Sequence, residues 1–193
     1  IYHPGASLNV LADYNTNRKT NVDSIATIVK LAVIQHLKPI VFLSPMTVCR
    51  RHQEGSLVIL HEERIHADPE GLLTAYAQSK WAGEQILSAA VERGVPVKIY
   101  RTSHALPPAS TGQAKPQDTY MSVLHAAYAA GVVPDWPDSC FYGMPVDVLA
   151  RLLVASSLED DGYSGVIHMD NHAPFSLQSV VEVLLDGDGK LPR

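Results

Sequence analysis

The sequence LLTAYAQSKWAGEQILSAAVERGVPVKIY, residues 72–100, contains the two elements that identify the fold class. Residues 72–93 have the composition and spacing of a long helix, and Gly94 is a typical residue for its C-terminal cap. Residues 96–100 form a short apolar run of the kind buried in a parallel sheet. A long helix followed directly by a buried strand is typical of α/β proteins. An apolar row predicts the buried face of the helix: Ala82, Ile86 and Ala90.

The same alternation of strand and helix occurs upstream. Residues 1–3 read as a strand that ends at the turn residues Pro4 and Gly5. Apolar residues recur over 15–37 at the spacing of one helix face, and residues 40–43 are a wholly apolar run. We therefore predict an α/β fold with a parallel, Rossmann-like sheet and flanking helices, whose strands are joined by right-handed crossovers.

We interpret the 193 residues as a single domain fragment with two parts. Residues 1–104 form the remaining Rossmann-like part, which includes the long helix. Residues 105–193 form a small, mostly substrate-binding subdomain, with Rossmann elements returning near 145–170. The predicted sheet is incomplete because no Gly-x-Gly-x-x-Gly follows a strand anywhere in the sequence, so we expect a piece of a longer polypeptide. Further elements are expected as helices near 119–130, 146–158 and 177–185, and as strands at 57–60 and 165–169.

Composition and charge exclude several classes of partner. The chain has 15 Lys and Arg against 20 Asp and Glu, and its basic residues are scattered, so neither nucleic acid nor an anionic membrane is an expected partner. Its apolar stretches are too short or too charged to span a bilayer. The two cysteines, Cys49 and Cys140, show no metal-ligand spacing. We expect a cytoplasmic protein without a metal site.

Tyr76-Ala77-Gln78-Ser79-Lys80 places a phenol and an ammonium four residues apart at the start of the long helix. Residues at this spacing lie on one ridge, so their side chains can converge. A reductase delivers a proton to a carbonyl oxygen as hydride reaches the carbon, and a phenol does so if a nearby ammonium lowers its pKa. The pattern favours Tyr76 as proton donor with Lys80 as its cation, both beside the apolar row. The alternative is a chance pairing of a half-buried tyrosine with a solvated lysine.

Two hydroxyls follow the strand predicted at residues 40–43. Ser44 and Thr47 flank Pro45 and Met46 at the carboxyl end of that strand. Open α/β sheets bind ligands at this edge, so we predict that one of these hydroxyls reaches the substrate oxygen. The alternative is an ordinary turn, in which Ser and Thr are common.

The succession of these motifs resembles the thioester reductase domains of nonribosomal peptide and polyketide synthetases, and the related carboxylic acid and aminoadipate reductases. All belong to the extended short-chain dehydrogenase type. The resemblance covers nearly the whole chain. The segments that carry it are Ile1 to Ala6, Asn21, the strand ending at Ser44, Tyr76 to Ala82 with Glu84, Ile99 to Arg101, Thr111-Gly112 and Pro145 to Asp147.

The resemblance implies an NADPH-dependent reductive release. A peptidyl or acyl thioester on the phosphopantetheine arm of a carrier protein takes hydride and leaves as an aldehyde or alcohol, and upstream synthetase domains supply it. By this analogy Tyr76 donates the proton and Lys80 holds the nicotinamide ribose. The other residues that the analogy places near the cofactor are His3, Gly5, Ala6, Asn21, which braces the site from its helix, and Arg101.

Two departures from the family pattern leave alternatives open. The family has a catalytic Thr or Ser where this chain has Pro45, so Ser44 or Thr47 would have to replace it. Without the glycine-rich turn that holds the pyrophosphate, we expect weak or no NADPH binding by this chain alone. A truncated, non-redox remnant that docks a carrier protein, or promotes cyclisation without cofactor, is therefore an alternative. A sugar-nucleotide epimerase or dehydratase is a third.

Overall fold

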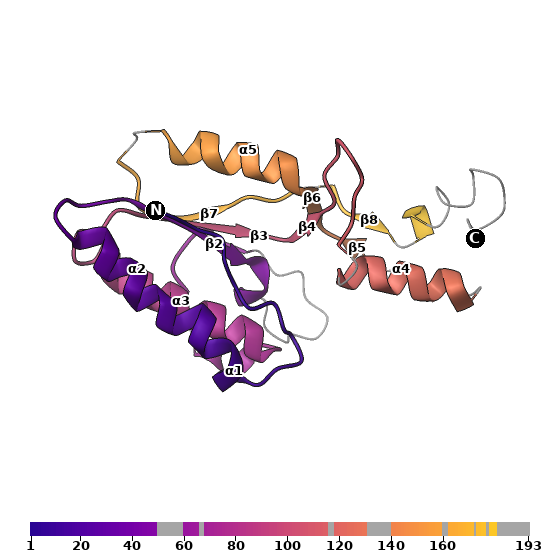
Figure 1. Ribbon diagram of the computed structural model, residues 1–193, viewed down its shortest axis with the longest axis horizontal. Helices are drawn as coiled ribbons and strands as arrows, with labels where there is room; N and C mark the ends of the chain where they lie inside the picture. The colour runs from indigo at the N-terminus through magenta and orange to yellow at the C-terminus, as the bar shows by residue number, and fades with distance from the viewer. Residues whose placement is uncertain are drawn as a thin grey trace. The chain divides into compact units, whose positions relative to one another are not determined.

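In the computed structural model, the described residues are 1–49, 60–65, 68–115, 118–130, 140–159, 162–171, 173–176 and 178–180. Within them, a parallel sheet of four strands has the order β1-β2-β3-β7 (Figure 1). The predicted fold class, α/β with a parallel sheet and flanking helices, is confirmed. The strands are β1 (Tyr2–His3), β2 (Ile40–Pro45), β3 (Val97–Thr102) and β7 (Gly165–His168).

The two central strands extend further toward the carboxyl edge than the sequence predicted. β2 and β3 pair in register from Ile40 opposite Val97 to Pro45 opposite Thr102. Ser44 and Arg101, which lie just past the predicted ends of these strands, are therefore also paired residues of the sheet. The predicted strand over 165–169 is found as β7, which ends one residue earlier.

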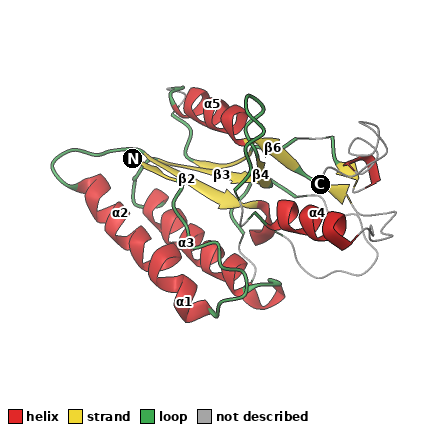
Figure 2. Cartoon of the chain, turned by 45° about the vertical axis from the view of Figure 1, so that its right-hand side comes forward, coloured by secondary structure: helices red, strands yellow, loops and turns green. Residues whose placement is uncertain are grey.

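Helices cover one face of this sheet. The predicted helix over 15–37 is present as three consecutive pieces, α1 (Tyr14–Arg18), a π-helix (Lys19–Asp23) and α2 (Ser24–Val33). It ends at Val33 because Ile34 is extended and Gln35 has a φ of 63°. α3 (Ala75–Val91) lies beside α2 (Figure 2), and its first turn is capped by the Thr74 side chain, which accepts from the Ala77 N–H.

The buried face of α3 differs from the predicted one. Ala82 and Ile86 are only partly buried, although Ala90 is buried as expected. The prediction holds for Ala90 but not for Ala82 and Ile86, because it assumed an apolar interior, whereas two charged residues of α3 have partners on the sheet, described below. The side chains that α3 buries are Ala77, Ser79, Lys80, Glu84, Leu87 and Ala90, together with the backbone at Gly83.

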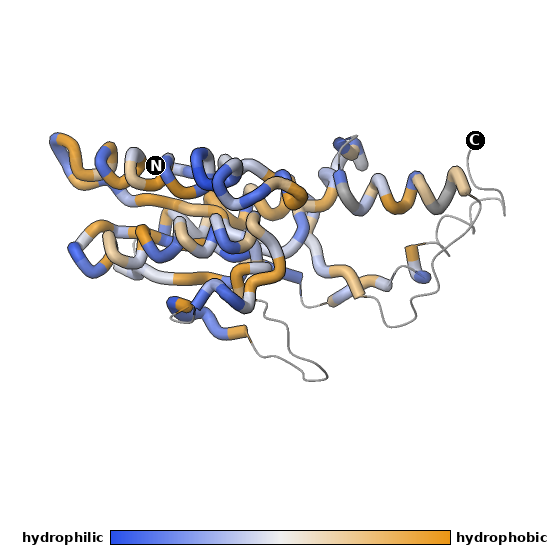
Figure 3. The backbone as a smooth tube through the Cα atoms, turned by 90° about the horizontal axis from the view of Figure 1, so that it is seen from below, coloured by the Kyte–Doolittle hydropathy of each residue, from blue (hydrophilic) through white to orange (hydrophobic). Residues whose placement is uncertain are grey.

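The hydrophobic core lies between this helical layer and the sheet. Phe42 of β2 and Ile99 of β3 pack with Ile25 of α2 and Leu87 of α3, and all four are at most 2% exposed. Hydrophobic and hydrophilic residues alternate along the helices (Figure 3), as expected for helices with one face on a core. At Gly83 a Cβ would lie 3.0 Å from the Asn21 carbonyl oxygen, so the close approach of α3 to the π-helix favours a glycine.

The chain divides into two compact units. Unit 1 contains residues 1–103 and 153–169, and unit 2 contains residues 104–152 and 170–193. In unit 1 the C-terminal end of α5 (Val146–Ser157) lies on the sheet face opposite α3, where the Tyr100 hydroxyl donates to Ser156 Oγ at 3.0 Å (Figure 1). The first part of α5 belongs to unit 2.

The described residues of unit 2 form short strands and the helix α4 (Thr119–Ala130). The strands are β4 (His104–Leu106), β5 (Cys140–Phe141), β6 (Gly143–Pro145) and β8 (Phe175–Ser176). β4 pairs with β6 in parallel, and β5 pairs with β8 antiparallel. The helices predicted near 119–130 and over 146–158 are confirmed. Most of the helix predicted near 177–185, and residues 57–59 of the predicted strand at 57–60, lie outside the described residues.

Among the described residues, no helix is long and apolar enough to cross a membrane. In the same part of the chain, no three His, Cys, Asp or Glu side chains are grouped as metal ligands would be.

Candidate active site at the carboxyl edge of the sheet

Lys80 extends from α3 to the carboxyl end of β2. Its ammonium donates a hydrogen bond to the Leu43 carbonyl oxygen at 2.8 Å and lies 3.9 Å from the centroid of the Phe42 ring. The side chain is only 1% exposed. Tyr76 lies one turn earlier on the same helix and is partly buried. The structure therefore brings Lys80 to the edge at which open α/β sheets bind ligands, with Tyr76 one helical turn away.

The pKa values of this pair differ from the sequence expectation. Burial raises the pKa of Tyr76 to about 12, so the expected lowering by Lys80 is not found. Burial lowers the pKa of Lys80 to about 8, and the negative charge of Glu84 opposes that lowering. The expectation failed because Lys80 is turned to a carbonyl of β2 and removal of water dominates both groups. At pH 7 the phenol keeps its proton, as a proton donor must.

The two candidate hydroxyls occupy different environments. Ser44 is fully buried, and its Oγ has no hydrogen-bond partner among the described residues. Because side chains alternate along a strand, Ser44 shares the sheet face of Phe42, on which Lys80 lies. Thr47 is exposed, in the 3-10 helix Met46–Val48 that follows β2. Thr102 of β3, which the sequence analysis did not single out, also has a buried hydroxyl without a partner in the described chain.

His3, at the end of β1, also contacts the Phe42 ring. Its ring stacks on Phe42 with centroids 5.9 Å apart, and its Nε2 is 3.4 Å from Ser24 Oγ. Burial and the charge of Lys80 both lower the pKa of His3. The predicted residues His3 and Lys80 are thus gathered around one aromatic ring. Gly5 is exposed, and a Cβ there would contact only His3 Cε1, at 4.0 Å.

Asn21 connects the segment after β1 to the start of α3. Its Oδ1 accepts from the Ser7 N–H at 2.7 Å, and its Nδ2 donates to the Ser7 carbonyl at 3.1 Å and to Ser79 Oγ at 2.9 Å. Ser79 Oγ in turn donates to the Tyr76 carbonyl oxygen at 2.7 Å. The Asn21 amide is therefore occupied within the chain, and it links the backbone beside Ala6 to the helical turn that carries Tyr76.

A buried ion pair lies next to Lys80 and was missed by the sequence analysis. Arg101 of β3 and Glu84 of α3 are 0% and 2% exposed, and their closest contact joins Nη2 to Oε2 at 2.7 Å. Arg101 was predicted to contact the cofactor, but its guanidinium is engaged by this carboxylate. The sequence signal was partial: Arg101 directly follows a run predicted to be buried, where a charge needs a partner, but nothing in the spacing named Glu84 as that partner.

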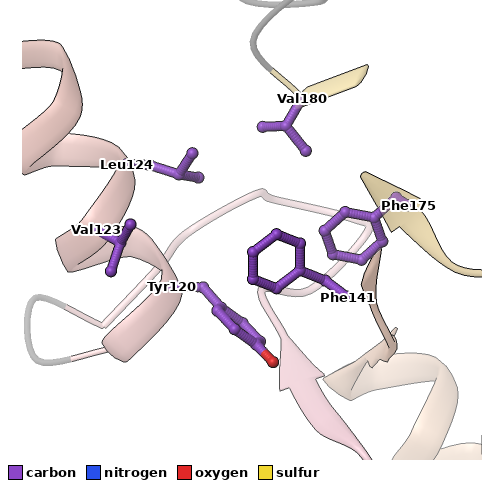
Figure 4. Close-up of a pocket in the computed structure, with 6 residues that line it drawn as sticks. All are labelled: Tyr120, Val123, Leu124, Phe141, Phe175 and Val180. Carbon is purple, nitrogen blue, oxygen red and sulfur yellow. The ribbon is translucent and has the colours of Figure 1, made fainter. Parts of the chain in front are cut away.

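Unit 2 contains a small apolar pocket (Figure 4). Phe141 and Phe175 stack with centroids 5.7 Å apart, and Tyr120 meets Phe141 edge to face at 4.8 Å. Figure 4 shows these rings and aliphatic side chains of α4 directed toward one another. The lining residues are Tyr120, Val123, Leu124, Phe141, Phe175 and Val180.

Comparison with known proteins places this chain in a family. Residues 1–153 match the model of the male sterility protein family of NAD-binding domains, so the chain belongs to that family. It is 32% identical to the isonitrile lipopeptide synthase of Streptomyces coeruleorubidus and 27% identical to the carboxylic acid reductase of Segniliparus rugosus. The alignments cover 95% and 100% of the chain but only 12% and 18% of those relatives.

The solved structures agree with the sequence relatives. The terminal R domain of the myxalamid PKS-NRPS biosynthetic pathway superimposes with a TM-score of 0.87 and 28% identity, over 94% of this chain and 46% of that one. A thiolation-reductase di-domain from an archaeal nonribosomal peptide synthetase shares the fold, with a TM-score of 0.83 at 21% identity. The resemblance inferred from the sequence is confirmed.

Proposed function

We propose that this chain is part of an NADPH-dependent reductase that releases a peptidyl or acyl thioester from the phosphopantetheine arm of a carrier protein, as an aldehyde or alcohol. The observation that carries the proposal is the Lys80 ammonium at the carboxyl end of β2, one helical turn from the protonated Tyr76, in a chain of an NAD-binding family. The named relatives, a lipopeptide synthase and a carboxylic acid reductase, support the thioester as substrate.

The residues present fit the nicotinamide end of such a cofactor. Lys80 would hold the ribose, and His3 with the backbone of Gly5 and Ala6 would lie beside it. The Ser44 hydroxyl on the same sheet face is buried and has no partner in the described part of the chain, which supports a polar ligand there. When bound, the reduced cofactor supplies hydride. Tyr76 gives its proton to the carbonyl oxygen of the thioester, and the Lys80 charge stabilises the phenolate that remains.

The partners we propose are a carrier protein and upstream synthetase domains. The relatives are far longer than this chain, and one solved neighbour joins a thiolation domain to a reductase. We assign substrate binding to residues 105–193, and the apolar lining of the unit 2 pocket supports an apolar part of the substrate.

The test is Tyr76→Phe in the full-length protein, with thioester reduction followed by the loss of NADPH absorbance. Removing a general acid lowers turnover by about 100-fold or more, while circular dichroism and the unfolding midpoint stay unchanged. Tyr14→Phe, at a partly buried tyrosine of α1, is the matched control and keeps full turnover. Undiminished reduction by Tyr76→Phe rules out this role for the phenol.

A non-redox domain that docks a carrier protein or promotes cyclisation is the second candidate, and Pro45 favours it. Proline has no hydroxyl to offer the substrate oxygen, and the neighbouring Ser44 and Thr47 are buried and exposed, respectively. Cyclised product formed from the carrier-bound thioester, without consumption of NADPH, would select this candidate.

A further inference from the structure

Glu84 and Arg101 form a buried ion pair that is held by several hydrogen bonds. Arg101 Nε donates to Oε1 and Oε2 of Glu84 at 3.1 and 3.2 Å, and Nη2 donates to Oε2 at 2.7 Å. The remaining Nη1 is 3.4 Å from Nε2 of His168 on β7, and the guanidinium also contacts the Cys49 side chain. A planar guanidinium matches a carboxylate with two parallel hydrogen bonds, which a lysine ammonium does not.

The same carboxylate is within reach of Lys80 along the helix. Glu84 follows Lys80 by four residues, the spacing at which opposite charges pair on a helix surface. Yet the Lys80 ammonium binds the Leu43 carbonyl instead, and Glu84 acts on it through its charge. Two cations therefore share one buried anion, and the arginine holds it.

We propose that Glu84 and Arg101 are positioning residues for Lys80: Arg101 takes up the Glu84 carboxylate, so that the Lys80 ammonium stays at the carboxyl end of β2 instead of pairing along α3. The pair also influences whether Lys80 is protonated. The negative charge of Glu84 favours the ammonium form, and the positive charge of Arg101, bound to the same carboxylate, weakens that effect. A role of this positioning in catalysis rests on the proposed function, whereas the positioning of Lys80 by Glu84 and Arg101 does not.

Among the described residues, the titratable and charged groups around Lys80 come from three elements. α3 contributes Glu84, with Tyr76 one helical turn from Lys80, β1 contributes His3, and β3 contributes Arg101 through Glu84. β2 presents the Phe42 ring and the Leu43 carbonyl, which carry no formal charge. Substitution of Glu84 or Arg101 therefore changes the charge near Lys80 in opposite directions.

The experiment is a pH titration of Lys80 by NMR in the chain labelled with ¹³C at the lysine Cε, its signal being assigned with Lys80→Met. We expect a midpoint of about 8 in the wild type. Glu84→Gln keeps the shape of the side chain but removes its charge, so the midpoint falls by about one unit. Arg101→Met frees the carboxylate for Lys80, so the midpoint rises by about one unit. Glu92→Gln, at the exposed end of the same helix, leaves it unchanged.

A purely structural role of the Glu84–Arg101 pair predicts a different result. If the pair only held α3 on the sheet, both substitutions would admit water and both midpoints would rise toward the ordinary lysine value of about 10.4. A rise or no change in Glu84→Gln therefore overturns the proposal. If Arg101→Met does not fold, Arg101→Lys is the second variant, because it keeps the positive charge but lacks the forked guanidinium that binds the carboxylate with two hydrogen bonds. The Lys80 midpoint in Arg101→Lys is then expected above the wild-type value but below about 9. The titration midpoints of the Glu84 and Arg101 variants are measured without NADPH. Their outcome therefore tests this proposal independently of the proposed function.

Discussion

At the scale of single residues, the position of Lys80 costs the folded chain stability. Burial lowers the pKa of its ammonium to about 8, whereas an unfolded lysine titrates near about 10.4. Below pH 8 both states carry the charge, and the folded state bears the full cost of burying it. Between the two values the unfolded chain binds more protons than the folded one, so the Lys80 contribution makes stability rise with pH.

Lys80→Met should therefore stabilise the chain while removing the proposed function. We expect the free energy of unfolding at pH 7 to increase by on the order of 1–3 kcal/mol, and this gain to shrink as pH rises from about 8 to about 10. Urea unfolding of the wild type and the variant at pH 7 and pH 10 measures both effects. Lys30→Met, at an exposed position of α2, serves as the control. A less stable Lys80→Met at pH 7 would show that the hydrogen bond to Leu43 outweighs the cost of burial.

At the scale of elements, the π-helix connects the segment after β1 to α3. A π-helix is rare and is often found at functional sites. Here it carries Asn21, whose amide bonds both backbone groups of Ser7 and the hydroxyl of Ser79. The connection reaches the helical turn that carries Tyr76, because Ser79 Oγ donates to the Tyr76 carbonyl oxygen.

Asn21→Ala should loosen this connection. The substitution leaves buried partners of the amide unsatisfied, so we expect a loss of about 1–3 kcal/mol in the free energy of unfolding. Asn15→Ala makes the same change at an exposed position of α1 and should stay within about 0.5 kcal/mol of the wild type. Urea unfolding measures the free energy of unfolding of both variants. Equal values for Asn21→Ala and Asn15→Ala would contradict a bracing role for Asn21.

At the scale of the whole molecule, the chain holds the Tyr–Lys helix of an NAD-binding family but no glycine-rich turn in its sequence. The phosphates of a dinucleotide rest on such a turn and on the helix behind it. The curated relatives named above are more than five times as long as the segments to which this chain aligns. The contacts of Lys80 and His3 would bind only one end of the cofactor.

We therefore expect NADPH to bind weakly or not at all to this chain alone. Calorimetry on the chain and on a longer version extended upstream, into a glycine-rich strand and turn, compares the two directly. Where the cofactor binds, a free concentration of about 100 times its dissociation constant stabilises the folded state by about 2.7 kcal/mol. Thermal unfolding detects this stabilisation as a higher midpoint. Tight binding by the short chain would contradict the need for the glycine turn. Absence of binding by both would favour the non-redox candidate.

The sequence by itself determined the elements and the family. Regular apolar spacing over residues 72–93 and the apolar runs at 40–43 and 96–100 predicted α3, β2 and β3, because periodicity reports which local structure can bury its side chains. The spacing of Tyr76 and Lys80, with the motifs around them, was enough to identify the resemblance to reductase domains.

The tertiary structure alone decided the partners and the charges. Spacing could not show that Arg101, 17 residues away, would hold Glu84, nor that Lys80 would turn to a carbonyl of β2. It predicted a wholly apolar buried face for α3, which also buries Lys80 and Glu84, and a lowered pKa for Tyr76, which burial raises instead. The reason is physical: a pKa and an ion pair depend on which atoms of distant segments exclude water from a group, and only the packed chain brings those atoms together.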